Sequence, residues 1–293
     1  RAHVADVSQW LCRQLSLWRH AALPRPLHER IEQHHAPHTG TLVSLMEPTT
    51  TVASRLQAVR DRIVRVAQSV DRPPSEIRLL VASKTHPAER VREAWQAGQT
   101  IFGENYLQEA LAKMPALTDL PIEWHFIGPI QSNKTKRIAE NFVWVHGVDR
   151  VKIADRLAKD RPDSLPPLQI CLQVNVSGEA SKSGVAPEEL AQLAAHVIRL
   201  PRLKLRGLMA VPELTTATAL QRSQFHMLWE LYDRLKRDGY ELDTLSMGMS
   251  EDMEIAITEG ATMVRIGTAI LGPRRYLIPE ELAIRAAKNS VTQ

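Results

Sequence analysis

The sequence predicts a single (β/α)8 barrel with one additional helix in front of it, and three observations carry this prediction. From residue 77 onward, apolar strand-like stretches alternate with helical patterns, which favours parallel strand pairing. Eight such units fall within about 220 residues, a length that suits a closed barrel better than an open sheet. A doubly wound sheet, the alternative, would place a glycine-rich turn after the first strand, whereas the chain has ASKTHP there.

The expected elements follow in order along the chain. The additional helix is expected over residues 52–70, where apolar residues recur at helical spacing after threonines that can cap it. Strands are expected at residues 77–84, 100–106, 122–130, 141–148, 168–176, 203–211, 244–250 and 262–270. Helical patterns between them lie at residues 87–98, 132–140, 150–160, 187–200 and 220–239.

The composition excludes several classes of protein. The chain has 293 residues, of which 44% are hydrophobic and 24% charged, with a formal net charge of +4. It lacks the long lysine and arginine runs of a nucleic-acid-binding tail, so we expect no nucleic-acid partner. Since Cys12 and Cys171 form no CxxC pair, neither a disulfide framework nor a zinc site is indicated. No apolar run reaches the roughly 18 residues of a transmembrane helix, and we expect no membrane partner and a cytoplasmic location.

The first 45 residues differ in composition from the rest of the chain. They hold six of the eleven histidines and two of the six tryptophans, with prolines at positions 24, 26 and 37 that interrupt a helix. The histidine spacing matches no standard metal site. We therefore expect residues 1–45 to be an atypical extension, disordered or not native to the domain, and residues 46–293 to form the barrel.

A lysine stands where the first predicted strand ends, in the stretch LLVASKTHP. Lys84 has two interpretations. A lysine at a strand end often keeps its stem in the apolar layer and its ammonium group in water. A lysine in a partly desolvated pocket instead has a reactive neutral amine, which attacks carbonyls to form a Schiff base.

Polar residues and glycines recur at the ends of the other predicted strands. The carboxyl ends of barrel strands face one mouth, where the chemistry of such folds gathers, so these residues are expected to meet there. They are Asn105, Gly128, Asn175, Ser177, Ser250, Gly267 and Thr268. Their convergence favours the reactive interpretation of Lys84.

The segments after the seventh and eighth predicted strands suggest an anion site. Ser250 is expected to cap a short helix that begins near Glu251, where it either satisfies a free amide or helps the helix end to bind a phosphate. Gly267, followed by Thr268, would let a phosphate approach the backbone where barrels often bind one. Glu251 and Asp252 would repel an anion unless they point outward.

An arginine completes the pattern. Arg265 lies two residues before Gly267 and would need an acceptor inside the barrel, since a buried unpaired charge is costly. A Schiff-base lysine, a phosphate cradle and an arginine between them describe a pocket for pyridoxal 5'-phosphate (PLP). A lysine aldolase acting on a phosphosugar would need the first two features but not the arginine.

Seven motifs then appear in order over roughly residues 46–276: VASKTHP, FGENYLQE, WHFIGPIQSNK, QVNVSGEASKSGV, GLMAV, LSMGMSEDMEIAI and ATMVRIGTAILGPRRY. Through them the chain resembles the pyridoxal phosphate homeostasis proteins, PLP-binding proteins of the YggS/PROSC type. Pro129 departs from the family pattern, which usually has histidine there, and residues 1–45 have no counterpart in the family.

The resemblance implies a single-domain barrel of the alanine racemase N-terminal type with PLP held as a Schiff base on Lys84. It also implies roles for the residues that match the family motifs. The phosphate is held by Ser250, Gly267 and Thr268, Arg265 lies near the pyridine nitrogen, and Asn105 lies close to the ring.

The chemistry of the cofactor narrows the function. An arginine beside the ring nitrogen disfavours a second positive charge there, which weakens the cofactor as an electron sink. Racemisation would need two bases on opposite faces of the ring, and the short stretch after the eighth strand is too small for the domain that supplies the second base in alanine racemases. We predict a non-enzymatic protein that carries and buffers PLP and maintains vitamin B6 and amino-acid homeostasis. A PLP-dependent racemase-like enzyme is the alternative.

Partners and remaining residues complete the prediction. We expect a monomer, with apo forms of PLP-dependent enzymes as recipients of the cofactor. Lys134 and Lys182, in loops at the same mouth, are either surface lysines or acceptors of the aldehyde when it leaves Lys84. His125 and His146 are expected to be packed core residues without an assigned role.

Overall fold

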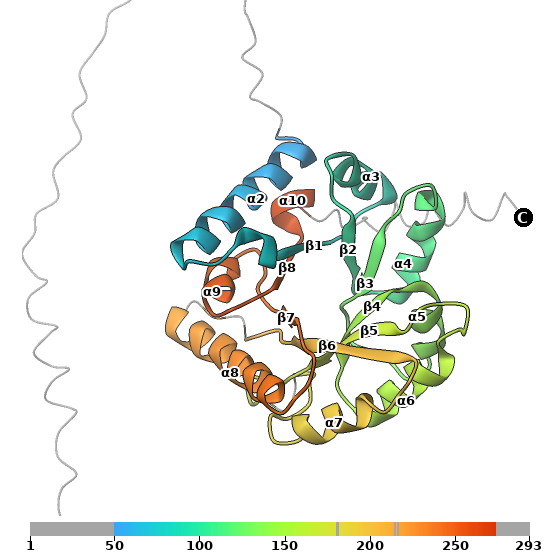
Figure 1. The fold of residues 1–293 in the computed structure, drawn as a ribbon. Coiled ribbons are helices and arrows are strands. Elements are labelled where there is room, and N and C mark those ends of the chain that lie inside the picture. The colour runs from blue at the N-terminus through green and yellow to red at the C-terminus, as the bar shows by residue number, and fades with distance from the viewer. Residues whose placement is uncertain (1–49, 180–181, 214, 216, 274–293) are drawn as a thin grey trace, which may run out of the picture. The chain divides into compact units, whose positions relative to one another are not determined.

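The computed structural model describes residues 50–179, 182–213, 215 and 217–273, which form a closed barrel of eight parallel strands arranged in chain order (Figure 1). The strands are β1 Arg78–Ala82, β2 Ile101–Glu104, β3 Glu123–Phe126, β4 Trp144–Val148, β5 Leu168–Gln173, β6 Leu203–Met209, β7 Thr244–Ser246 and β8 Met263–Ile266. The barrel predicted from the alternation of elements is confirmed. The predicted extension over residues 1–45 lies outside the described residues.

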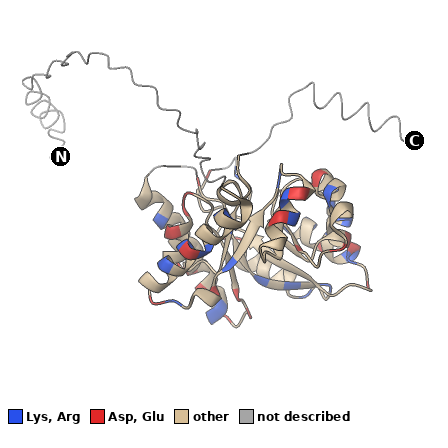
Figure 2. Ribbon diagram, turned by 90° about the horizontal axis from the view of Figure 1, so that it is seen from above, with Lys and Arg blue, Asp and Glu red and all other residues tan. Residues whose placement is uncertain are grey.

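Helices surround the barrel (Figure 1). They are α2 Val52–Ser69, α3 Ala88–Gln96, α4 Leu107–Lys113, α5 Thr135–Asn141, α6 Val151–Asp160, α7 Leu190–Val197, α8 Thr218–Arg237, α9 Met253–Thr258 and α10 Thr268–Leu271, with 3-10 turns at η1 Pro74–Glu76 and η2 Met114–Leu117. Charged residues of both signs lie mainly on these outer helices (Figure 2).

The additional N-terminal helix is present as α2. The side chain of Thr51 accepts a 3.1 Å hydrogen bond from the amide of Ser54 and caps its first turn. Its buried stripe of Val52, Leu56, Val59, Ile63 and Ala67 belongs to the main hydrophobic core. Because the stripe recurs at helical spacing, the helix buries one face against the barrel and its neighbours α9 and α10.

The strands are shorter than the apolar stretches that predicted them. β1 ends at Ala82 rather than at Lys84, and β7 covers only Thr244–Ser246 of the expected 244–250. Apolar side chains continue past the last strand residue because the loops at this mouth are themselves buried, as Met247 shows with 0% exposure. Lys84 therefore lies in a turn two residues beyond the strand, which places its side chain in the mouth.

The interior of the barrel contains polar side chains as well as apolar ones. His125 on β3, His146 on β4, Ser246 on β7 and Arg265 on β8 are each no more than 5% exposed. A small separate apolar cluster of Trp144, Cys171 and Met209 packs nearby within the barrel. Since bulky branched residues usually fill such barrels, the polar interior calls for a specific explanation.

Candidate cofactor site

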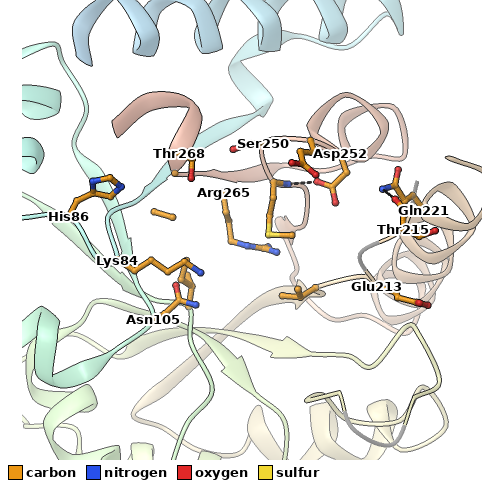
Figure 3. Close-up of a pocket in the computed structure, with 16 residues that line it drawn as sticks. Lys84, His86, Asn105, Glu213, Thr215, Gln221, Ser250, Asp252, Arg265 and Thr268 are labelled. Carbon is orange, nitrogen blue, oxygen red and sulfur yellow. Dashed lines mark hydrogen bonds between the residues drawn. The ribbon is translucent and has the colours of Figure 1, made fainter. Parts of the chain in front are cut away.

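A cavity of about 890 Å3 opens at the carboxyl ends of the strands, and all six predicted site residues line it (Figure 3). They come from the loop after β1, the end of β2, β8 and the segments after β7 and β8. The six are Lys84, Asn105, Ser250, Arg265, Gly267 and Thr268. Residues that are far apart in the sequence thus share one cavity, because the carboxyl ends of all parallel strands in a closed barrel lie at the same mouth.

The loop that carries Lys84 is held by a buried ion pair. Lys113 on α4 donates hydrogen bonds of 2.6 Å to Glu104 Oε1 and of 2.7 Å to the carbonyl oxygen of Ser83. Ser83 Oγ donates a further 2.6 Å bond to the same carboxylate oxygen. Glu104 is fully buried, and burial raises its pKa, opposed by the Lys113 ammonium group and by the Ser83 hydrogen bond. The ion pair therefore fixes the residue that immediately precedes Lys84.

A second contact fixes the residue that follows Lys84. Thr85 has a φ of 65°, in the left-handed region that non-glycine residues rarely adopt. Its amide donates a short hydrogen bond to the carboxylate of Glu109 on α4. Strained backbone of this kind persists only where its surroundings determine it, so α4 holds both sides of the Lys84 turn.

Asn105 presents an unsatisfied polar atom at the cavity. Its side-chain oxygen Oδ1 is buried and has no hydrogen-bond partner among the described residues. Gly128, at the end of the third unit, passes so close that a Cβ there would lie 2.2 Å from the carbonyl oxygen of Asn105. A glycine at 128 is therefore required to seat Asn105, and a buried acceptor without a donor indicates a place where a ligand group would bind.

Arg265 is 5% exposed and anchored on two sides within the barrel. Its Nη1 donates a 2.8 Å hydrogen bond to Ser246 Oγ, and its Nη2 donates a 2.8 Å bond to the carbonyl oxygen of Ala210. Burial lowers the pKa of the guanidinium to about 10, opposed by the nearby charge of Asp252. The acceptors that the sequence required are thus present, and the group remains cationic at neutral pH.

The expected cap of the helix after β7 is wrong in detail. Helix α9 begins at Met253 with Asp252, not Ser250, in the N-cap position. The Asp252 carboxylate accepts a 2.5 Å hydrogen bond from the amide of Met249, and the helix begins about two residues later than the pattern predicted. Ser250 is left to line the cavity, and Asp252, also part of the lining, is 7% exposed and engaged with the loop.

The segment after β8 approaches the first strand closely. A Cβ at Gly267 would lie 3.0 Å from the carbonyl oxygen of Ala82, so a larger residue would displace the backbone that borders the cavity. Thr268 begins α10, and the amides of Ile270 and Leu271 in that helix donate hydrogen bonds to the carbonyl oxygen of Gly267.

Other residues considered from the sequence lie elsewhere. Lys134, Lys182, Asn175 and Ser177 are not among the residues that line the cavity. His125 and His146 are fully buried in the barrel, so the prediction that they are core residues is confirmed.

Sequence reasoning missed a part of the cavity wall, where the loop after β6 and the start of α8 supply Val211, Glu213, Thr215 and Gln221. The sequence signal that could have indicated them is their position at or shortly after the end of the sixth predicted strand. Among the described residues, no group of three or more histidine, cysteine or acidic residues is placed to hold a metal ion. No helix within the same ranges is long and apolar enough to cross a membrane.

Comparison with known proteins identifies the relatives of this chain. Residues 54–275 match the family model described as "Alanine racemase, N-terminal domain". A pyridoxal phosphate homeostasis protein of Pseudomonas aeruginosa is 60% identical over 230 residues, which cover 78% of this chain and 99% of that protein. The structure of PipY from Synechococcus elongatus with PLP bound is 36% identical with a TM-score of 0.67, covering 76% of this chain and 100% of that one. An alanine racemase structure from Clostridium difficile is 11% identical with a TM-score of 0.60, covers 72% of this chain and 56% of that one, and shows the fold alone.

The closed barrel and the matching family model define a protein of the alanine racemase N-terminal class. The cavity at its carboxyl mouth joins a lysine, an arginine and a serine–glycine–threonine set. Within that class, the chain belongs to the family of pyridoxal phosphate homeostasis proteins. The resemblance carried by the seven motifs is thereby confirmed.

Proposed function

We propose that this chain binds PLP in the cavity at the carboxyl mouth and carries and buffers it for vitamin B6 and amino-acid homeostasis. The observation that carries the proposal is the convergence of Lys84, Arg265, Asn105 and the Ser250–Gly267–Thr268 set on one cavity. Two relatives support it, since the Pseudomonas aeruginosa protein is named for PLP homeostasis and the PipY structure contains PLP.

The residues present fit the cofactor at both of its ends. Ser250 and Thr268 offer hydroxyl groups, and Gly267 gives close backbone approach, as a phosphate group requires. The unpartnered Oδ1 of Asn105 would accept a hydrogen bond from the bound ligand. Bound PLP supplies an aldehyde that condenses with a primary amine to a Schiff base, with loss of water. In this proposal Lys84 provides that amine and Arg265 faces the pyridine nitrogen.

The lysine and the arginine have distinct tasks. Lys84 holds the cofactor covalently, and the fixed turn around it keeps the amine aimed into the cavity (Figure 3). Arg265 donates hydrogen bonds and keeps its charge, so it opposes protonation of the ring nitrogen. A cofactor held in this way is a weak electron sink, which suits carriage of PLP rather than turnover.

We further propose that the protein has no catalytic turnover. Racemisation needs a second base on the ring face opposite Lys84. Among the described residues that line the cavity there is no tyrosine, the residue that supplies this second base in alanine racemases. A PLP-dependent racemase-like enzyme, the alternative raised by the sequence, would convert single L- or D-amino acids, and chiral analysis after incubation tests this directly.

Delivery of PLP to apo-enzymes is part of the proposal. The cavity of about 890 Å3 lies toward the upper end of the usual range for small-molecule pockets, roughly 300–1,000 Å3. That volume leaves room for an incoming amine beside the cofactor. The monomeric state and the cytoplasmic location stay predictions from the sequence.

An absorption spectrum of the purified protein with added PLP tests the central proposal. A Schiff base gives an absorbance band in the near-violet, which disappears on reduction with borohydride. Peptide mapping of the reduced protein should place the pyridoxyl group on Lys84. A spectrum equal to that of free PLP, with no label after reduction, would refute PLP carriage through a lysine.

A further inference from the structure

A chain of hydrogen bonds leads from the cofactor cavity into the barrel. Arg265 Nη1 on β8 donates a 2.8 Å bond to Ser246 Oγ on β7. Ser246 Oγ lies 2.9 Å from His146 Nδ1 on β4. Strands β7 and β4 are not neighbours in the barrel, so this link crosses its interior.

The chain continues to the opposite mouth. His146 Nε2 lies 2.9 Å from His125 Nδ1 on β3, and His125 Nε2 lies 2.8 Å from Glu123 Oε1. Glu123 is the first residue of β3, at the amino ends of the strands, and its side chain is 35% exposed. The three residues between the two ends, Ser246, His146 and His125, are 0% exposed. A continuous polar path therefore joins the two mouths through a closed interior.

The far end of the path is held in place by aromatic and ionic contacts. The His125 ring stacks on Trp144 with centroids 5.2 Å apart and planes within 6°. Arg78 donates a 2.6 Å hydrogen bond to Glu123 Oε1 and lies 5.5 Å from the Trp144 ring centroid. Arg206 lies 5.0 Å from the same ring. These contacts fix the orientation of both His125 and Glu123.

The chemistry of the two ends dictates where each proton lies. The hydrogen bond from His125 lowers the pKa of Glu123 to about 2, so its carboxylate only accepts. Burial lowers the pKa of His125 to about 4 and that of His146 well below its usual value, so each ring carries one proton. His125 then donates from Nε2 and accepts at Nδ1.

The same assignment passes along the remaining links. His146 must donate from Nε2 to His125 and accept at Nδ1, so the Ser246 hydroxyl donates to His146. The Ser246 oxygen keeps a lone pair for Arg265, which can only donate. Every bond thus runs in one direction, from the guanidinium at the cavity to the carboxylate at the opposite mouth.

We propose that Glu123, His125, His146 and Ser246 are positioning residues that hold Arg265 in place and make the carboxylate of Glu123 a remote determinant of the cofactor's electronic state. The proposal rests on the proposed function, in which Arg265 faces the pyridine nitrogen. Aligned hydrogen bonds polarise one another in a low-dielectric interior. The negative charge of Glu123 at one end therefore strengthens the hydrogen bond that Arg265 donates at the other end. Apolar residues in place of this path could also pack the barrel interior, but Arg265 would then lack the acceptor that Ser246 provides.

The proton assignment is tested first, on the cofactor-free protein. Nitrogen-15 NMR of histidine-labelled protein at neutral pH should show both His125 and His146 as neutral rings protonated on Nε2. Single His→Gln variants at each position assign the two signals. A cationic ring, or a proton on Nδ1 of either residue, would overturn the one-directional chain. This outcome does not depend on PLP. It therefore tests the hydrogen-bonded path separately from the proposed function.

The remote influence is tested with labelled PLP. Glu123→Gln keeps the acceptor oxygen but removes the charge, and it should shift the nitrogen-15 resonance of the bound pyridine ring. Glu259→Gln is the matched control, because Glu259 is a largely buried acidic residue four positions before β8 that pairs with Arg222 and His226 rather than with the hydrogen-bonded path. It should leave the resonance in place.

A double variant shows whether Glu123 affects the bound pyridine ring through the hydrogen-bonded path. Ser246→Ala removes the link to Arg265, so adding Glu123→Gln to it should produce no further shift. A shift of equal size in both backgrounds, or an equal shift from Glu259→Gln, would show that Glu123 acts through the general field of the barrel and would overturn the proposal. Thermal unfolding of each variant checks that the barrel is intact.

Discussion

Lys113 and Glu104 form a 2.6 Å ion pair inside the protein, with side chains 4% and 0% exposed, against the loop that carries Lys84. The same ammonium group binds the carbonyl oxygen of Ser83, the residue before Lys84. The pair therefore links the stability of the barrel to the geometry of the proposed cofactor amine.

Removing one partner of this pair should be costly. Lys113→Met keeps much of the side-chain volume but leaves Glu104 buried without its counter-ion, and we expect a loss of about 3–5 kcal/mol in the free energy of unfolding. Denaturant unfolding at neutral pH measures it. Lys136→Met on the surface, where the side chain is 73% exposed, is the control and should change stability by under about 0.5 kcal/mol.

The cost should depend on pH in a defined direction. Burial in the folded protein raises the pKa of Glu104 above the ordinary value of 4.5 for a glutamate, and loss of Lys113 removes the main opposing influence. A group whose folded pKa is raised favours folding at low pH, and this stabilisation is lost as pH rises through the folded pKa. The deficit of Lys113→Met relative to the parent should therefore shrink as pH falls toward about 4.5. A deficit that grows on acidification would contradict the assignment.

The barrel and most of the site could be predicted because they depend on local order along the chain. Alternating elements fix the strand sequence, and residues at strand ends must share one mouth, which brought Lys84 and Ser250 together in prediction and structure. The supporting contacts depend on distant pairs. Ser246 looked like part of an apolar strand, yet it bonds to His146, 100 residues away in sequence. Lys113 lies at the end of α4, a helix that the sequence patterns did not single out, and the packing of that helix buries it.

Ser250 should contribute to binding of the phosphate group. Ser250→Ala removes one hydroxyl from the cavity wall, and we expect PLP to bind about 1–2 kcal/mol more weakly, the range for a hydrogen bond to a charged group. Pyridoxal lacks the phosphate and should bind almost unchanged. Titration with both ligands makes the comparison, and equal weakening of the two would place the phosphate elsewhere in the cavity.

Residues 1–45 should be dispensable for the fold and for PLP binding. The first described helix, α2, begins at Val52, and the side chain of Thr51 caps its first turn. A chain that starts at Met46 should keep its melting temperature and its PLP affinity. Calorimetry and ligand titration of both forms test this, and a clear drop in either quantity would show that the segment supports the barrel.

Lys84 should be the residue that carries PLP. Its turn is fixed by the bond of Ser83 to Lys113 and by the bond of Thr85 to Glu109, and its side chain lines the cavity. Lys84→Ala should abolish the Schiff-base absorbance while the melting temperature stays close to that of the parent, because a partly buried residue in a loop contributes little to the core. Lys84→Arg should also abolish it, since a guanidinium keeps the charge but forms no stable imine.

Lys134 and Lys182 provide matched controls for this prediction. Neither lines the cavity, so Lys134→Ala and Lys182→Ala should keep the absorbance of the parent protein at equal PLP concentration. If either residue accepts the aldehyde during transfer, its variant should slow the release of PLP to an added apo-enzyme without changing the equilibrium spectrum. Borohydride reduction and peptide mapping decide among the three lysines. A label found mainly on Lys134 or Lys182, with Lys84 unmodified, would return Lys84 to the ordinary role of a strand-end lysine with its ammonium group in water.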